Sequence, residues 1–145
     1  MSEPKIPEGY HTVTPYLSIR GLGELIEFVQ AAFAAELKEC ISGPDGLPRH
    51  AEVQIGGSMV MMGEAPGEGS TFPAMLYLYV PDVDTLFQKA IACGAGEVRG
   101  LQDEPYGDRV GAVSDPVGNQ WWIATRKETL TSEEIAERLS EDGGS

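Results

Sequence analysis

The sequence predicts an α+β fold made of two pseudosymmetric modules followed by a C-terminal helix. The chain repeats itself at a spacing of 61 residues, since Tyr16–Ile19 recurs as Tyr77–Val80 and Gly57 recurs as Gly118. In both copies an alternating, strand-like stretch precedes apolar residues at helical spacing. Solenoids need at least three repeats, so two copies indicate one pseudosymmetric domain.

The first module is expected to begin after a polar, extended arm over Met1–Tyr10. Residues Val13–Ile19 alternate in the manner of a strand. Apolar side chains at helical spacing then predict an amphipathic helix over residues 23–35. Beyond a turn at residues 43–46, strands over His50–Ile55 and Met59–Met62 flank Gly56-Gly57, which is a strong hairpin signal.

The second module repeats this order. Its expected elements are a linker around Pro66–Ser70, a strand over Met75–Val80, a helix from Asp82 closed by Gly94, and strands over Gly111–Ser114 and Gln120–Thr125 joined by the turn Asp115–Gly118.

A capping box of Thr131 and Glu134 predicts the C-terminal helix, whose apolar edge we expect to dock on the body or on a partner subunit. The chain is thus one domain, residues 1–145, with module 1 at about 12–63, a linker at about 64–73, module 2 at about 74–126 and the helix at about 131–140.

The composition limits the classes of partner. A net charge of -13 and a pI near 4.4 argue against nucleic acid and anionic membranes, and leave cationic or neutral ligands open. The sequence has no membrane-length apolar run and no export signal, so we expect a cytoplasmic protein. Cys40 and Cys93 lack metal-binding or redox spacing and are expected to be buried, reduced thiols.

Four motifs in this order carry a resemblance to a known family. They are Thr14–Leu17, His50–Glu52, Tyr106–Arg109, and Asp115–Asn119 followed by Trp121–Thr125. From about residue 12 to 139 the chain resembles the vicinal oxygen chelate superfamily of glyoxalase, bleomycin-resistance and extradiol-dioxygenase proteins, with the phosphonate-operon B-like subgroup most similar. The resemblance implies a glyoxalase-like fold of two βαβββ modules whose curved sheets enclose a concave site, and a homodimer.

The resemblance also places four metal-ligand positions, at Thr14, Met61, Met75 and Trp122. A hydroxyl is a poor donor, thioethers prefer soft ions, and indole cannot coordinate a cation. We therefore expect neither a metal nor another cofactor.

Strand alternation predicts what takes the place of the metal, because only one face of each sheet packs against a helix. The opposite face is expected to form a ligand pocket of Met, aromatic and polar side chains: Thr14, Tyr16, Gln54, Met59, Met61, Met75, Tyr77, Tyr79 and Trp122. The alternative is that these side chains fill the sheet interior or a dimer interface.

His50 and Glu52 share this face and are the candidate catalytic residues, because a carboxylate can orient an imidazole as a general base or join it at a displaced metal. A hydrogen-bonded pair without catalysis is the alternative that we favour. In the repeat the two residues are expected to match Gly111 and Val113, so any activity should lie in one half.

Three other polar residues are given structural roles. His11 is expected outside the pocket. Asp108 and Arg109 are expected to form a local ion pair that fixes the loop before their strand, with contact to a ligand as the alternative. Asn119 is expected to be a turn residue, since asparagine tolerates left-handed geometry.

Three functions fit these expectations. The first, which we favour, is metal-free binding or sequestering of a small organic molecule, cationic or aromatic. The second is a lyase, isomerase or dioxygenase that uses His50 and Glu52, with or without a displaced divalent metal. The third is a non-catalytic dimeric scaffold or regulatory subunit.

Overall fold

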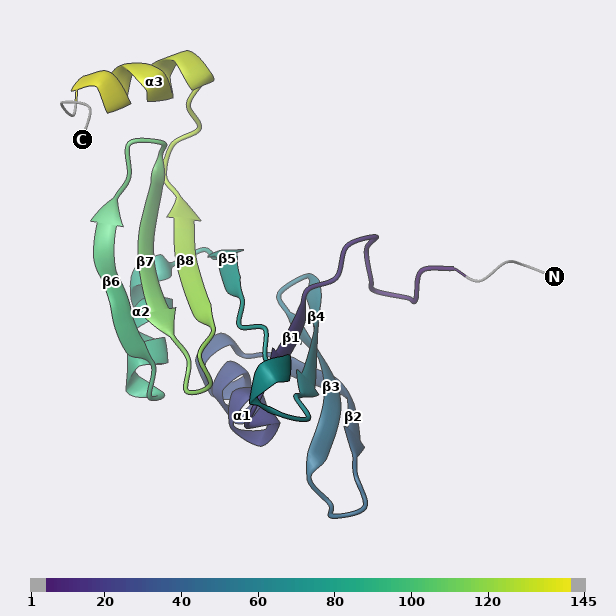
Figure 1. Cartoon of the computed structure of the whole chain (residues 1–145). Coiled ribbons are helices and arrows are strands. Elements are labelled where there is room, and N and C mark those ends of the chain that lie inside the picture. The colour runs from purple at the N-terminus through teal and green to yellow at the C-terminus, as the bar shows by residue number, and fades with distance from the viewer. Residues whose placement is uncertain (1–4, 142–145) are drawn as a thin grey trace. The chain divides into compact units, whose positions relative to one another are not determined.

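The computed structural model describes residues 5–141, which form two four-stranded sheets and three α-helices (Figure 1). The chain divides into two compact units, one of residues up to 74 with 115–119, the other of residues 75–114 with those from 120 onward. The elements are β1 Tyr16–Ile19, α1 Leu22–Phe33, β2 Glu36–Ser42, β3 Pro48–Ile55, β4 Ser58–Glu64, the 3-10 turn η1 Glu68–Ser70, β5 Met75–Tyr79, α2 Val83–Ala92, β6 Gly96–Asp103, β7 Asp108–Ser114, β8 Gln120–Arg126 and α3 Ser132–Glu141.

The first unit contains a sheet with strand order β1-β4-β3-β2, in which β1 runs parallel to β4 and the other pairs are antiparallel. Helix α1 covers one face of this sheet. Leu17 and Val53 of the sheet and Leu25 and Val29 of the helix have no exposed surface. The inward-facing side chains at the centres of β1 and β3 are thus in the core.

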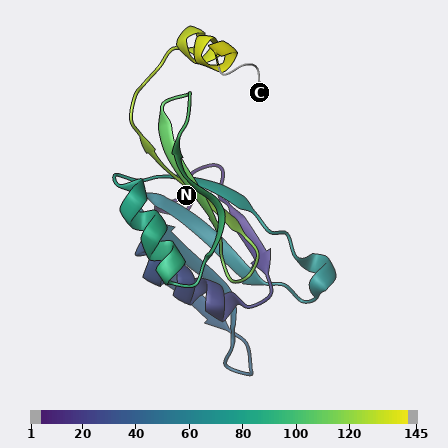
Figure 2. The same cartoon turned by 90° about the vertical axis from the view of Figure 1, so that its left-hand side faces the viewer.

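The second unit repeats this arrangement with strand order β5-β8-β7-β6, and α2 packs on β6, β7 and β8 (Figures 1 and 2). Trp121 and Ile123 of β8 are completely buried, and Phe87 of α2 is nearly so. Both units therefore have the βαβββ order that the family resemblance implied.

Residue patterns in the sequence located most elements but gave a wrong start for the first strand and missed two edge strands. The first strand begins at Tyr16 rather than at Val13, which lies before the sheet and is 83% exposed. Strands β2 and β6 had no recognisable pattern of their own. Every residue of β2 is exposed, so this edge strand lacks the apolar alternation by which a half-buried strand is recognised.

The helix termini follow capping chemistry. Asp82 accepts a hydrogen bond from the backbone of Thr85, and Thr131 and Glu134 form the reciprocal bonds of a capping box. Helix α1 begins at Leu22, and Gly21 before it has no side chain to cap the helix. The Glu64 carboxylate of β4 accepts the amide hydrogen of Leu22 instead, at 2.8 Å.

The last helix, α3, contacts the second unit but does not bury the apolar edge by which we expected it to dock. No residue of α3 is buried. Arg138 binds the Glu128 carboxylate at 2.8 Å and the Pro105 carbonyl oxygen at 3.3 Å, while Leu139 remains 49% exposed. An ion pair and a backbone contact, rather than an apolar face, tie this helix to the second unit.

The turn at residues 115–119 corrects one expectation. Gly118, not Asn119, takes the left-handed conformation, with φ 103°. Asn119 is fully buried: its Oδ1 accepts from the amide of Ala74 at 2.9 Å and its Nδ2 donates to Asp115 at 2.9 Å. Asn119 therefore joins two distant segments of the first unit, which a turn motif alone does not indicate.

Both cysteines are free thiols, but the expected burial was wrong for Cys40, which is exposed on β2, and is only partial for Cys93. Within residues 5–141 no helix is long and apolar enough to cross a bilayer.

Candidate ligand-binding site

Each sheet has one face that its helix does not cover, which we call its open face. The alternation along β5 is clear, since Met75, Tyr77 and Tyr79 are 61, 39 and 58% exposed whereas Leu76 and Leu78 between them are half-buried. On β1, Tyr16 is 52% exposed and Leu17 is fully buried. Large apolar side chains thus remain uncovered on the open faces.

The open face of the first sheet carries the His50–Glu52 pair. Strand pairing sets Tyr16 beside Met61 and Met61 beside Glu52 in one cross-strand row. His50 Nε2 lies 2.9 Å from Glu52 Oε2, and its ring is 6.0 Å from that of Tyr16. Gly63 leaves room for the Tyr16 hydroxyl, because any Cβ there would collide with it.

Tyr10 completes this group from outside the sheet. Its hydroxyl donates to Glu52 Oε1, so Glu52 is bound on both oxygens. The hydrogen bonds from Tyr10 and then from His50 lower the pKa of Glu52, while burial and the neighbouring carboxylate raise the pKa of Tyr10 to about 12. Sequence patterns missed Tyr10, since an irregular arm carries no periodicity that shows where its side chains lie.

The open face of the second sheet has a different centre, the buried carboxylate of Asp108. Tyr77 and Tyr79 donate to Asp108 Oδ2 at 2.9 and 2.8 Å, and Arg126 Nε donates to Oδ1 at 2.6 Å. Burial opposes ionisation of Asp108, but the bonds from Arg126 and the two tyrosines outweigh it, and the pKa of Asp108 falls below its usual value. Burial, Tyr106 and Asp108 raise the pKa of Tyr77. The network therefore surrounds an ionised carboxylate with two tyrosine hydroxyl donors and an arginine.

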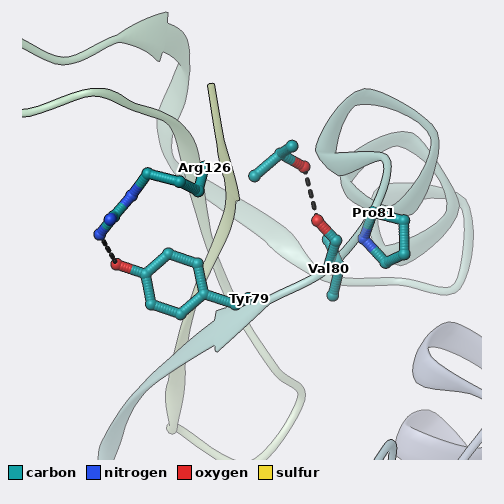
Figure 3. Close-up of a pocket in the computed structure, with 5 residues that line it drawn as sticks. Tyr79, Val80, Pro81 and Arg126 are labelled. Atoms are coloured by element: carbon teal, nitrogen blue, oxygen red, sulfur yellow. Dashed lines mark hydrogen bonds between the residues drawn. The ribbon is translucent and has the colours of Figure 1, made fainter. Parts of the chain in front are cut away.

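A shallow depression of about 670 Å³ adjoins this network at the ends of β5 and β8 (Figure 3). Its lining residues are Tyr79, Val80, Pro81, Thr125 and Arg126. The Arg126 guanidinium carbon lies 5.5 Å from the centre of the Tyr79 ring, and Arg126 Nη2 donates to the Tyr79 hydroxyl at 3.1 Å. The depression thus has a cationic and aromatic wall.

A second arginine lies over an aromatic ring further along the same sheet. Arg99 is 5.7 Å from the centre of the Trp122 indole and forms an ion pair with Glu104. Trp122 Nε1 donates to Gln120 Oε1 at 3.0 Å, which fixes the plane of the ring. Trp122 is adjacent to Tyr77 in the strand pairing, so both rings belong to one row.

The structure corrects the expected Asp108–Arg109 ion pair. Neighbouring residues of a strand point to opposite faces. Arg109 accordingly binds Asp84 at 2.8 and 3.1 Å and Asp103 at 3.3 Å, while Asp108 binds Arg126.

The expected repeat partners of His50 and Glu52 are also wrong. Glu52 is paired with Met61, whereas the repeat counterpart of Met61, Trp122, is paired with Ala112. The match in this strand is thus 60 residues rather than 61, because the paired residues Ala112 and Trp122 lie ten positions apart whereas Glu52 and Met61 lie nine apart. A side chain at Gly111 would meet Phe87 of α2, so Gly111 belongs to the helix face.

The remaining predicted residues lie at the margins of the open faces. Thr14 is half-buried just before β1, and Met59 on β4 is only 8% exposed. The Gln54 amide donates to the Gly56 carbonyl oxygen at 3.0 Å, which directs it toward the hairpin turn. His11 is exposed in the arm.

Comparison with known proteins identifies the family of this fold. Residues 11–123 match the family model described as the Glyoxalase/Bleomycin resistance protein/Dioxygenase superfamily. The chain belongs to this superfamily. It is similar to an uncharacterised protein of Mycobacterium bovis, with 32% identity over 142 residues that cover 90% of this chain and 93% of the relative.

Solved structures of the superfamily fold agree with this assignment. The chain is similar to TioX from Micromonospora sp. ML1 at 25% identity and a TM-score of 0.67, covering 83% of this chain and all of TioX. It also shares its fold with a PhnB protein from Bacillus cereus at 20% identity and a TM-score of 0.66, covering 79% of this chain and 99% of that one.

The four positions that the family resemblance assigns to metal ligands carry side chains that are poor ligands for a hard or borderline divalent cation. Those positions carry Thr14, Met61, Met75 and Trp122, which supply no carboxylate or imidazole. Among residues 5–141 no cluster of three or more His, Cys, Asp or Glu side chains has the geometry of a metal site.

Proposed function

We propose that this protein binds and sequesters a small aromatic molecule on the open faces of its sheets, without a metal cofactor. The observation that carries the proposal is the exposure of Tyr77, Tyr79 and Met75 on a face whose polar groups are already paired through Asp108. Aromatic rings held rigidly at a surface offer contact area at a small cost in conformational entropy.

The chemistry of the second sheet favours a planar ligand. Arg126 lies over Tyr79 and Arg99 over Trp122, so a flat ring can stack on either the indole or a guanidinium. The net charge of -13 disfavours a strongly anionic ligand over longer distances. A neutral or cationic aromatic compound fits both conditions.

The donor set at the metal positions supports the metal-free part of the proposal. A catalytic cation needs about three protein ligands of N, O or S type, and the thioethers and indole found there bind hard or borderline divalent ions poorly. Stabilisation by a ligand should therefore persist in the presence of a chelator.

The test is a thermal-shift screen of aromatic compounds against the full chain in the presence of EDTA. A compound present at 100 times its Kd should stabilise the fold by about 2.7 kcal/mol and raise Tm by roughly 5–10 °C. Trp122→Ala and Tyr79→Ala should reduce this shift, whereas Leu139→Ala, which truncates an exposed apolar side chain on α3, should leave it unchanged. A broad screen without any stabilising compound would refute the proposal.

The His50–Glu52 contact of 2.9 Å favours acid–base chemistry as a second candidate function. In this case a compound from the screen should be converted, and His50→Ala should stop the conversion while binding persists. Mass spectrometry of each bound compound after incubation measures this directly. Recovery of every compound unchanged would leave binding alone as the function.

A further inference from the structure

The N-terminal arm, here residues 5–15, contacts the open face of the first sheet at Glu52 and Met59. The arm is the purple segment that leads into β1 in Figure 1. The Tyr10 hydroxyl donates to Glu52. One residue earlier, a Cβ on Gly9 would lie 4.0 Å from Met59 Cγ. Tyr10 and Gly9 thus lie over two of the side chains that face away from α1.

The arm is held by few features of its own. The Tyr10 amide donates to the Pro7 carbonyl oxygen at 3.0 Å, which forms a local turn, and residues 5–15 contribute no strand to the sheet. Ile6 and Val13 are 53% and 83% exposed, so these apolar side chains do not anchor the arm. The Met61 amide donates to the Pro15 carbonyl oxygen at 2.9 Å and ties the end of the arm to β4, so the residues before it can lose the Tyr10–Glu52 hydrogen bond while this attachment remains.

The chemistry of this contact is that of a bound phenol. Glu52 is a carboxylate with a lowered pKa, and the Tyr10 phenol keeps its proton because its pKa is raised to about 12. A hydroxyl that donates to an ionised acceptor forms one of the stronger hydrogen bonds in proteins. His50 holds the second Glu52 oxygen, which orients the carboxylate toward the donor.

We propose that Tyr10 occupies the place of a ligand, and that Glu52 with His50 recognises a phenolic hydroxyl on an aromatic compound that displaces the arm. The inference rests on the proposed function, because it names the chemical class that one of the two open faces binds. Glu52 supplies the acceptor, and Tyr16 and Met61 in the adjoining strands supply the apolar surface beside the ring. Binding of the phenol and seating of Tyr10 are then mutually exclusive.

The experiment measures binding of 4-methylphenol, which is the tyrosine side chain as a free molecule, to the full chain by calorimetry. Removal of an internal competitor increases the fraction of protein that can bind, so Tyr10→Ala should lower the Kd by about tenfold relative to the unmodified chain. Tyr10→Phe keeps the ring but loses the donor, and its Kd should fall between the two. Adding Glu52→Gln to Tyr10→Ala should abolish the gain.

The matched control ligand is 4-methylanisole, which has the same ring but no donor and should bind Tyr10→Ala about tenfold more weakly than 4-methylphenol, because it cannot donate to Glu52. Equal Kd values of the two compounds for Tyr10→Ala, equal Kd values of 4-methylphenol with and without Tyr10, or no binding of 4-methylphenol to Tyr10→Ala would each overturn the inference. Cooperative thermal unfolding of every variant excludes loss of the fold. If 4-methylphenol does not behave as predicted but the unmodified chain still binds compounds from the screen, the inference is wrong and the proposed function stands. If no compound from the screen binds either, both are wrong.

Discussion

The open faces of the two sheets share a backbone plan but differ in charge and in the residues at their centres. The first sheet has Glu52 between His50 and Tyr10, with Met61 beside it. The second sheet has alanine in place of Glu52, at Ala112, and builds its centre on Asp108 instead. Duplication has thus preserved the packing faces while the open faces acquired separate chemistries.

The difference extends to how each carboxylate is held. Asp108 is buried and anchored by three side chains of its own unit, whereas Glu52 remains about one-quarter exposed and depends partly on an arm outside the sheet. The Asp108 centre is therefore built into the second unit, whereas the Glu52 centre can lose its contact with the arm. Two substitutions and one pH titration test this contrast.

Asp108→Ala should have the largest effect. It leaves Tyr77 and Tyr79 without an acceptor and Arg126 without its counter-ion, so we expect a loss of about 3 kcal/mol in the free energy of unfolding, measured by urea denaturation. The control is Asp103→Ala, which removes a side chain that is 76% exposed and should change stability by less than about 0.5 kcal/mol. Similar values for both variants would mean that the network contributes little.

Glu52→Ala should have a smaller effect, because it gives the first sheet the residue that the second sheet has at the same place. We expect a loss of about 1 kcal/mol and faster proteolysis of the arm, since the hydrogen bond from Tyr10 is removed. Glu39→Ala, on the exposed strand β2 beside Glu52, should alter neither. A loss as large as that of Asp108→Ala would contradict the contrast.

The smallest predicted effect appears at alkaline pH. The folded pKa of Tyr10 is raised from 10.0 to about 12, so its contribution to stability is complete below pH 10 and is lost as the pH rises toward 12. The near-ultraviolet absorbance of phenolate should show late-titrating tyrosines, and Tyr10→Phe should remove one of them while the contribution of Tyr77 remains. In Glu52→Gln the pKa of Tyr10 should fall back toward 10. A Tyr10 titration unaffected by Glu52→Gln would show that the carboxylate is not its partner.

The faces of the sheets could be predicted from the sequence because burial leaves a period of two. Leu17 and Trp121 are fully buried whereas Tyr16 and Tyr79 are exposed, as alternation required. The polar centres could not be predicted in this way. The Asp108–Arg126 pair depends on the register of β7 and β8, in which equivalent paired residues lie one position further apart along the chain than in β3 and β4.

The Tyr10–Glu52 contact is unpredictable for another reason. It joins residues 42 positions apart through an irregular segment, whose path depends on the surface over which it lies. Asn119 was misassigned for a related reason, because its sequence context describes a turn while its amide binds the distant backbone of Ala74. Local patterns report local geometry, and these three contacts are long-range.

The position of residues 115–119 has a consequence for how the chain can be divided. These residues connect β7 and β8 of the second unit but pack with the first, where Asn119 binds the Ala74 amide. A cut after residue 74 would therefore separate Asn119 from its partner and leave a buried amide and a backbone N–H unsatisfied. The two halves of the chain are therefore not interchangeable: the half that ends at residue 74 lacks residues 115–119 of its own compact unit, and a fragment that began at residue 75 would carry this loop without the segment against which it packs.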